Sequence, residues 1–275
     1  MADTPDSRPP AFDPTTVPIK PAATVMMVRD GGSGRSDGLE VFMLRRTGRA
    51  SFAAGMYVFP GGRVDDVDHA DEIAPFCKGL TDAAASAQLS IESGGLAYWV
   101  ASIRECFEEA GVLLAVRSDG APLELDNEER HAVHDGTLSM VELSQRHGLV
   151  LDLSTTHYVD HWITPIGENR RFDTRFFVTL APADQEGLQD DKETVESLWV
   201  RPDVALDMHA RGELMMLPPT VYNLKFLAEH ATASEAIAAS AARTDIPSIL
   251  PKMRTNDEGK FIGIALPGDP DYDSL

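Results

Sequence analysis

Three glutamates in the middle of the chain have the spacing of one helix face. Glu105, Glu108 and Glu109 stand at positions i, i+3 and i+4, and side chains so spaced lie on the same side of an α-helix. Like charges this close destabilise a helix by about 0.2–0.5 kcal/mol per exposed pair. A divalent cation would turn the repulsion into binding, because Mg²⁺ and Mn²⁺ prefer carboxylate oxygens. The spacing predicts a metal site, and the alternative is a solvated acidic face.

The residues around the three glutamates extend this pattern. Arg104 precedes them, Gly111 follows them, and Gly61 and Gly62 stand upstream. Together they resemble the Nudix box, Gly-x5-Glu-x7-Arg-Glu-(apolar)-x-Glu-Glu-x-Gly-(apolar). Gly62 fits the opening glycine, and residues 104–112 fit the second half. The chain is thus similar to the Nudix hydrolase superfamily.

The chain departs from this box in two places. Asp68 stands where the family has glutamate, and 35 residues separate Asp68 from Arg104 where the family has seven. An insertion at this place resembles one branch, the acyl-CoA diphosphatases and their bacterial relatives. Four further segments are similar to that branch: 58–62, 161–165, 171–177 and 266–269. The resemblance therefore spans roughly residues 20–270.

The resemblance implies roles for the residues of the box. The metal ligands would be the three glutamates and the carbonyl of Gly61, with Mg²⁺ or Mn²⁺ as the cofactor. One glutamate would act as general base. Arg104 would hold the acidic cluster through a charge-assisted bond, with Asp68 as its partner although aspartate is one methylene shorter than glutamate. The implied catalytic residues are Arg104, Glu105, Glu108 and Glu109.

A further carboxylate is expected from a remote loop, as members of the family often use one. Acidic residues crowd the approach to Trp199: Glu186, Asp190, Asp191, Glu193 and Glu196. Glu193 and Glu196 are the candidates, and we predict Glu193 as a metal ligand. A solvated acidic loop is the alternative for either one.

A second pattern lies just upstream of the box. Arg46, Gly55 and the run 59–62 resemble the coenzyme A signature Leu-Leu-Thr-x-Arg-(Ser/Ala)-x3-Arg-x3-Gly-x3-Phe-Pro-Gly-Gly. Ser51 replaces the second arginine of the signature, and Thr47 replaces Ser/Ala. Because a guanidinium pairs well with phosphate, we expect Arg46 to bind the substrate.

Two arginines farther along the chain flank Asp173. Arg171 and Arg175 could bind substrate phosphates or pair with structural acids, and the sequence leaves both open. The nearby His161 is expected to have a role in the core or at its rim. The predicted substrate-binding residues are Arg46, Gly55, Gly62, Arg171 and Arg175.

Composition excludes several classes of partner. The chain has 24 Lys and Arg against 44 Asp and Glu, a net charge of −20, which argues against nucleic acid and disfavours an anionic membrane. It has no apolar run long enough to span a bilayer. The two cysteines, Cys77 and Cys106, form no disulfide framework, so we expect a reducing, cytoplasmic location. A homodimer is left open.

The periodicity of apolar residues predicts the elements that must position these side chains. Expected strands cover 22–29, 39–46, 57–59, 157–163, 171–180, 197–201 and 261–266. Expected helices cover 81–88, 96–110, 124–134, 139–147, 202–211, 218–229 and 234–242. Such irregular alternation favours an α/β (α+β) fold with a mixed sheet covered by helices, and the resemblance implies a Nudix-type α/β/α sandwich.

The expected organisation is a single elaborated domain. Residues 1–20 read as a disordered tail, 21–270 as the Nudix domain and 271–275 as a second tail. An insertion covers 66–95, and a helical C-terminal part covers 202–242.

The reaction that the resemblance implies is metal-assisted hydrolysis of a diphosphate linked to another moiety. The expected substrate is CoA or an acyl-CoA, cut to a phosphopantetheine fragment and 3′,5′-ADP. The alternatives are an ADP-ribose or NADH pyrophosphatase, and a Nudix-fold module that senses a nucleotide without cleaving it. All three have a small nucleotide diphosphate as the binding partner.

Overall fold

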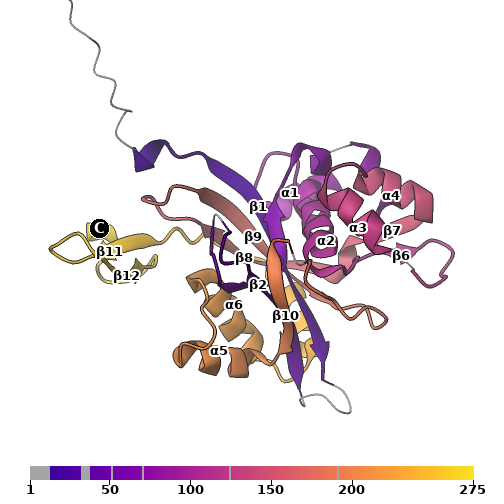
Figure 1. Ribbon diagram of the computed structural model, residues 1–275. Helices are drawn as coiled ribbons and strands as arrows, with labels where there is room; N and C mark the ends of the chain where they lie inside the picture. The colour runs from indigo at the N-terminus through magenta and orange to yellow at the C-terminus, as the bar shows by residue number, and fades with distance from the viewer. Residues whose placement is uncertain (1–12, 32–37, 51, 70, 124, 191) are drawn as a thin grey trace, which may run out of the picture.

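A mixed seven-stranded sheet forms the centre of the molecule (Figure 1). The computed structural model describes residues 13–31, 38–50, 52–69, 71–123, 125–190 and 192–275. The central path runs β10-β2-β1-β9-β8, with β3 paired to β2 and β4 to β1. Its strands are β1 (Ile19–Asp30), β2 (Leu39–Arg46), β3 (Tyr57–Val58), β4 (Gly61–Arg63), β8 (Thr156–Ile163), β9 (Arg171–Leu180) and β10 (Thr194–Val200).

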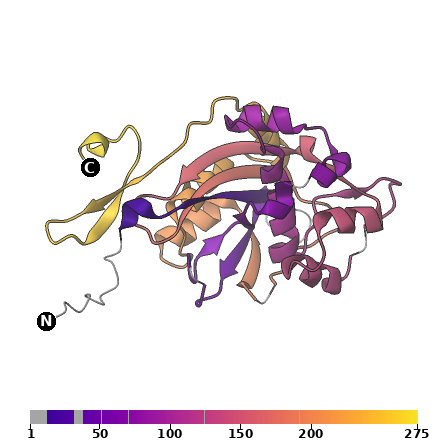
Figure 2. The same ribbon diagram turned by 90° about the horizontal axis from the view of Figure 1, so that it is seen from above.

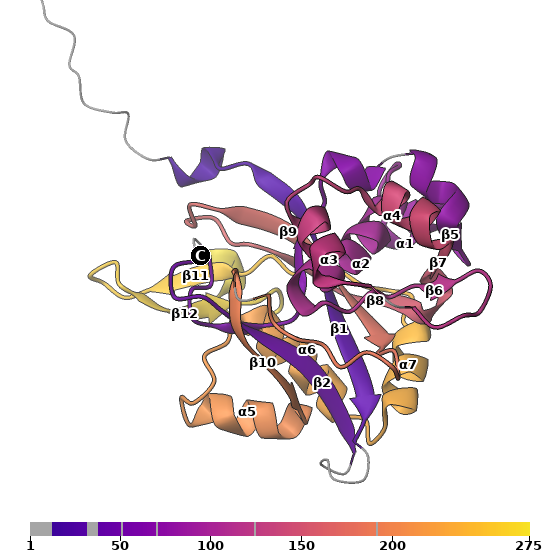
Figure 3. The same ribbon diagram turned by 45° about the vertical axis from the view of Figure 1, so that its right-hand side comes forward.

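Helices cover both faces of this sheet, so the predicted α/β/α sandwich is confirmed (Figures 1 and 3). Side chains of β1 alternate between the two layers: Val25 and Met27 pack with helix α2 (Leu96–Ala110), whereas Met26 and Val28 pack in the other core. The second layer holds α5 (Pro202–Ala210), α6 (Pro218–Ala228) and α7 (Ala233–Ala241). Successive residues of β1 therefore face opposite helical layers.

Helix α2 covers the predicted range 96–110. Trp99, Ile103 and Phe107 recur every fourth residue and are almost fully buried, which is the apolar stripe that docks an amphipathic helix on a sheet. Gly111 ends the helix in the left-handed conformation (φ 67°), and its N–H donates to the Phe107 carbonyl at 2.9 Å. Glycine adopts this conformation without steric cost.

Residues 66–95, the predicted insertion, contact α2 at its start and near its middle. They contain the 3₁₀ turns η2 (Asp66–His69) and η3 (Asp71–Phe76), strand β5 (Cys77–Lys78) and helix α1 (Asp82–Leu89). The Asp82 carboxylate accepts the N–H of Leu96 at 3.0 Å, so α1 satisfies a free donor at the start of α2. The insertion thus supports the helix that carries the glutamates.

A second small layer follows α2 in the chain (Figure 3). It contains strand β6 (Val116–Arg117), helices α3 (Asn127–His134) and α4 (Met140–His147), strand β7 (Leu149–Asp152) and the 3₁₀ turn η4 (Leu153–Thr155). Helix α3 starts later than predicted because Asp126 caps it, accepting the N–H of Glu129 at 2.8 Å. The predicted start, Glu124, lies outside the described residues.

Several boundaries differ from the prediction because pairing between strands decides them. β1 begins at Ile19 since its parallel ladder with β9 extends to Arg171. β10 begins at Thr194, opposite Arg46. β4 was not predicted, because two glycines give no strand signal.

The C-terminal segment folds back at the end of the molecule away from α2, α3 and α4 (Figure 2). It forms the hairpin of β11 (Lys252–Thr255) and β12 (Phe261–Ala265) and the turn η5 (Tyr272–Ser274). Arg254 pairs with Asp269 at 2.8 Å and with Asp271 at 2.6 Å. Residues 271–275, expected as a tail, are therefore tied to the hairpin. The described helices are all too short or too polar to cross a membrane.

Candidate active site

The glutamate half of α2 lies directly over the glycine strand β4. A Cβ on Gly62 would lie 2.4 Å from Glu105 Oε1, and one on Gly61 would lie 2.5 Å from the carbonyl oxygen of Ala23. Any side chain at either position would collide with these atoms, so glycine is required for the close approach. The N–H of Gly61 donates to Glu109 Oε2 at 3.0 Å. The two halves of the predicted motif are therefore in contact.

Arg104 is bound by Asp68 despite the insertion between them. Its Nε and Nη2 donate to the two carboxylate oxygens of Asp68, each at 2.8 Å, and Asp68 is 2% exposed. The turn η2 brings the shorter aspartate within reach. Arg104 Nη2 also donates to the carbonyl of Arg63 at 2.9 Å. The expected pairing is thus present as a two-point charged contact.

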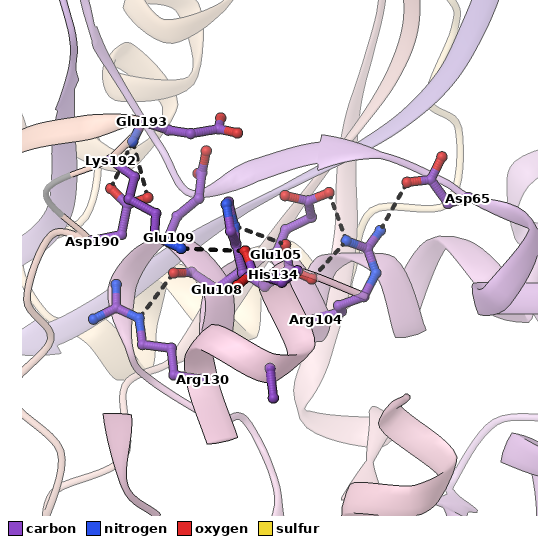
Figure 4. Close-up of polar contacts among 12 residues, drawn as sticks. Asp65, Arg104, Glu105, Glu108, Glu109, Arg130, His134, Asp190, Lys192 and Glu193 are labelled. Carbon is purple, nitrogen blue, oxygen red and sulfur yellow. Dashed lines mark hydrogen bonds and ion pairs between the residues drawn. The ribbon is translucent and has the colours of Figure 1, made fainter. Parts of the chain in front are cut away.

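Arg104 and Arg46 share the three glutamates. Figure 4 shows Arg104 beside Glu105 and Glu108. Arg104 Nη1 lies 2.9 Å from Glu105 Oε1 and 3.0 Å from Glu108 Oε1. Arg46 Nη1 lies 3.4 Å from Glu109 Oε1, and Arg46 Nη2 lies 3.2 Å from Glu193 Oε2. Arg46 therefore lies inside the acidic cluster and joins it to β10.

The structure separates the two candidates for the remote carboxylate. Glu193 reaches the glutamate cluster through Arg46. Glu196 lies 3.4 Å from Arg45 and accepts the hydroxyl of Tyr57 at 3.0 Å, and Tyr57 packs in the core on the other side of the sheet. Only Glu193 of this pair is placed beside α2.

Three glutamates share two arginines, so the positive charge of the arginines does not balance the carboxylates when all three are ionised. Burial raises the pKa of Glu105 well above its usual range and also raises that of Glu108. Burial raises the pKa of Glu109 to about 7, although Arg46 and the Gly61 N–H oppose the change. Buried carboxylates with excess charge are the donor set that suits a hard divalent cation.

The same carboxylates point toward arginines rather than toward a common centre. In the described part of the chain, no three acidic, histidine or cysteine groups are already arranged to hold a metal ion. The chemistry of the donors fits Mg²⁺ or Mn²⁺. Their orientation means that they would turn away from Arg104 and Arg46 to bind one.

Helix α3 contributes two residues for which the sequence analysis predicted no role. Arg130 Nε donates to the backbone carbonyl of Glu108 at 2.9 Å. His134 Nδ1 lies 3.6 Å from Glu108 Oε2. Their i, i+4 spacing on a predicted helix was the available signal, since it places both on one face.

The remaining predicted binding residues lie apart from the glutamates. Gly55 has a positive φ of 72° in the turn after β2, where a Cβ would meet no atom within 4 Å. Arg171 donates through Nε to the carbonyl of Thr164 at 3.0 Å. Arg175 donates to the hydroxyl of Tyr158 at 3.3 Å. Both arginines are buried.

Arg175 belongs to a polar cluster across strands β8 and β9. It contacts His161 Nδ1, and its Nε lies 3.5 Å from Asp173 Oδ1. His161 Nε2 lies 2.5 Å from the same oxygen of Asp173. Burial would raise the pKa of Asp173, but the bond from His161 and the charge of Arg175 outweigh it, and the pKa is lowered.

Comparisons with known proteins agree with the Nudix resemblance and with the fold. The model of the NUDT19 Nudix domain matches residues 81–227. The "Acyl-coenzyme A diphosphatase NUDT19" of Gallus gallus is 29% identical over 284 residues, covering 85% of this chain and 74% of that protein. The human protein of that name is 26% identical over 237 residues, covering 73% of this chain and 63% of the relative.

A solved structure shares the architecture. The crystal structure of a Nudix hydrolase from Alicyclobacillus acidocaldarius superposes with a TM-score of 0.68 at 27% identity, covering 81% of this chain and 97% of the other. This chain has a mixed sheet between helical layers and shares that fold with a solved Nudix hydrolase. It is therefore of the Nudix hydrolase class. Within that class the chain belongs to the family of the NUDT19 Nudix domain, whose model matches more than half of it.

Proposed function

We propose that this Nudix hydrolase cleaves the diphosphate of CoA or an acyl-CoA, giving a phosphopantetheine fragment and 3′,5′-ADP. The observation that carries the proposal is the trio of Glu105, Glu108 and Glu109 over Gly61 and Gly62. Glu108 and Glu109 are buried, Glu105 is half-buried, and arginines pair with all three. The relatives from chicken, frog and human are named acyl-coenzyme A diphosphatases. The chain spans 74%, 61% and 63% of their lengths, so their activity supports the substrate assignment by analogy.

We assign the metal ligands to the three glutamates, Glu193 and the carbonyl of Gly61. Mg²⁺ or Mn²⁺, when bound there, would supply positive charge to the oxygens of the diphosphate. In the metal-free protein Arg104 pairs with Glu105 and Glu108, and Asp68 fixes the guanidinium of Arg104. One of the three glutamates would accept the proton of the attacking water.

The position of Arg46 favours contact with the diphosphate of the substrate. Its guanidinium lies between Glu109 and Glu193, where it can meet a diphosphate oxygen once a cation takes over the carboxylates. Gly55 has open space at its Cβ position, whereas Gly62 makes room for the carboxylate of Glu105. The contacts of Arg171 and Arg175 favour structural pairing over phosphate binding.

A nucleotide diphosphate such as ADP-ribose or NADH is the second candidate substrate. The observation that favours it is the incomplete CoA signature, with Ser51 in place of an arginine and Arg46 engaged by glutamates. A non-catalytic sensor is disfavoured, because a sensor has no need of the whole trio together with its supporting Arg104–Asp68 pair.

A substrate panel tests the assignment. CoA, acyl-CoA, dephospho-CoA, ADP-ribose and NADH would each be incubated with Mg²⁺ or Mn²⁺, with products identified by mass. We expect 3′,5′-ADP from CoA and acyl-CoA. Hydrolysis of ADP-ribose or NADH with CoA left intact would contradict the CoA assignment and leave the Nudix class standing. No turnover of any member would favour the sensor.

We further infer that the protein lies in a reducing compartment such as the cytoplasm. We also infer that its partner is a small molecule. Cys77 and Cys106 are both free thiols, and burial raises the pKa of each, which makes them poor thiolate nucleophiles. The net charge of −20 opposes contact with nucleic acid. Measuring the thiols in the protein isolated from cells without reductant would test the compartment.

A further inference from the structure

Arg130 of α3 binds the backbone of two segments, α2 and the segment that precedes Glu193. Figure 4 shows its contact with Glu108. Its Nε donates to the carbonyl of Glu108 at 2.9 Å, and its Nη2 donates to the carbonyl of Leu188 at 3.0 Å. Arg130 is 6% exposed. A Cβ on Gly111 would lie 3.0 Å from Arg130 Nη1, so the last glycine of the motif also leaves room for this guanidinium.

The segment that contains Leu188 is docked on the end of α2. The N–H of Leu188 donates to the carbonyl of Ala110 at 2.8 Å. The side chain of Gln185 accepts from the N–H of Leu113 at 2.8 Å and donates to its carbonyl at 3.1 Å. Together with Arg130, these bonds hold residues 185–188 against the C-terminal end of the glutamate helix.

A short series of bonds then leads from this segment to Glu193. The Asp190 carboxylate accepts the N–H of Glu193 at 3.0 Å and that of Thr194 at 2.8 Å. Glu193 in turn lies 3.2 Å from Arg46, which contacts Glu109. The position of Glu193 relative to α2 therefore depends on how residues 185–190 are docked.

The chemistry of a helix end explains why an arginine is suited to this place. The last carbonyls of α2 have no partner within the helix, and a cation near a helix C-terminus is favoured by the helix dipole. A guanidinium offers several donors in a rigid plane, so Arg130 donates to the carbonyls of Glu108 and Leu188 at once and fixes their separation. Lysine carries its three donors on one rotating nitrogen, so it would not fix the separation of the two carbonyls in the same way.

We propose that Arg130 is a positioning residue, which sets the place of Glu193 relative to the glutamates of α2 and thereby the affinity of the cation site. The inference rests on the proposed function, because it assigns Glu193 to that site. Its contacts are with backbone carbonyls on both sides, so Arg130 acts through the two segments rather than on the substrate.

Two variants and two measurements test the proposal. In Arg130→Gln and Arg130→Lys we expect Mn²⁺ affinity, measured from the EPR signal of free Mn²⁺, to fall about tenfold or more, as is usual when a supporting residue of a metal site is lost. We also expect faster amide hydrogen exchange in residues 185–190 of the metal-free protein. Arg130→Lys provides the milder variant if Arg130→Gln does not fold.

Two control variants separate positioning from general effects. Arg146→Gln removes the same charge from an exposed side chain that pairs with Glu129 on the neighbouring helix. Leu143→Ala removes a fully buried side chain of α4 and lowers stability without touching residues 185–190. Neither control should change Mn²⁺ affinity or local exchange in these residues beyond about twofold.

The outcomes distinguish this inference from the proposed function. Unchanged Mn²⁺ affinity in both folded Arg130 variants would overturn the inference, even if exchange increased. A loss of affinity without faster exchange in 185–190 would overturn it too, since the stated route would be wrong. Failure of the metal site itself would appear in Glu108→Gln, which should bind Mn²⁺ more weakly than the wild type.

Discussion

Two buried charge clusters lie on the α2 side of the sheet, and they are balanced differently. The cluster of β8 and β9 contains one carboxylate, Asp173, with His161 and Arg175 as its partners. The cluster on α2 contains three glutamates that share Arg104 and Arg46. The pKa of Asp173 is lowered, whereas those of the glutamates are raised.

The two clusters are also neighbours in the sheet. Ladder pairs connect Gly62 to Ala23, Ala23 to Arg175 and Arg175 to His161. The same fold thus places a charge-balanced group about two strand spacings, roughly 10 Å, from a group with excess negative charge. The first cluster has its charge balanced within the chain, whereas the second keeps an excess of negative charge that a cation could neutralise.

The largest expected effect is a loss of turnover when a glutamate of the α2 cluster is replaced. Glu108→Gln keeps the size of the side chain and removes one charged ligand. We expect kcat to fall by about 10²-fold or more with the fold intact, as when a main electrostatic contribution to catalysis is lost. Steady-state kinetics would measure kcat, and circular dichroism would show whether the variant is folded. Near-normal activity in the folded variant would remove this helix from the mechanism.

The matching change in the balanced cluster should act on stability. Arg175→Met removes one partner from a buried charge network, a change that typically costs about 3–5 kcal/mol in the free energy of unfolding. We expect this loss in urea denaturation, while the activity per folded molecule stays within about threefold. A raised KM with unchanged stability would instead support the phosphate-binding role predicted from the sequence.

Weakening the contact between Asp68 and Arg104 should have a smaller effect on activity and on stability. Asp68→Asn keeps the shape of Asp68 but replaces one acceptor of its two-point contact with an NH₂ group. We expect activity to fall about tenfold, as for other supporting residues of metal sites, with a measurable loss in thermal stability. Asp65→Asn is the control, because Asp65 is half-exposed and 3.9 Å from Arg104. Equal effects of the two changes would argue against a specific role for Asp68.

The smallest effect is a pH dependence of the metal-free protein. The pKa of Glu109, about 7 when folded, exceeds the ordinary value of 4.5. The folded state then binds more protons between these pH values, so the free energy of unfolding falls as pH rises through that window. With chelator present, we expect the Tm of the wild type to fall by a few degrees from pH 5 to pH 7.5 relative to Glu109→Gln. Parallel Tm curves for the two proteins would contradict the raised pKa.

Local patterns were sufficient to predict the helix of the site. The apolar repeat of Trp99, Ile103 and Phe107 and the terminal Gly111 fix α2 at 96–110. They depend only on helix periodicity and on the conformational freedom of glycine. The placement of the three glutamates on one face of the helix follows from the same geometry. Strands β2 and β9 also have their predicted bounds, since both contain continuous runs of apolar residues.

Only the tertiary structure decided which distant residues join the glutamates. Asp68 reaches Arg104 because η2 packs on α2. The register of β10 against β2 shifts between Thr194 and Glu196. As a result Glu193 lies beside Arg46, whereas Glu196 lies beside Arg45 on the other face of the sheet. Sequence spacing cannot foresee either result, because strand register and packing depend on partners far along the chain.

The roles of the arginines were open for the same reason. Arg104 was identified by its place in the motif, whereas Arg130 has no signature and its contacts lie on the end of α2 and on residue Leu188. Arg175 satisfies Asp173 because β8 and β9 are adjacent. The sequence alone determined the acidic helix and the class of protein. The fold decided which charges are neutralised within the chain, because that depends on distances between elements.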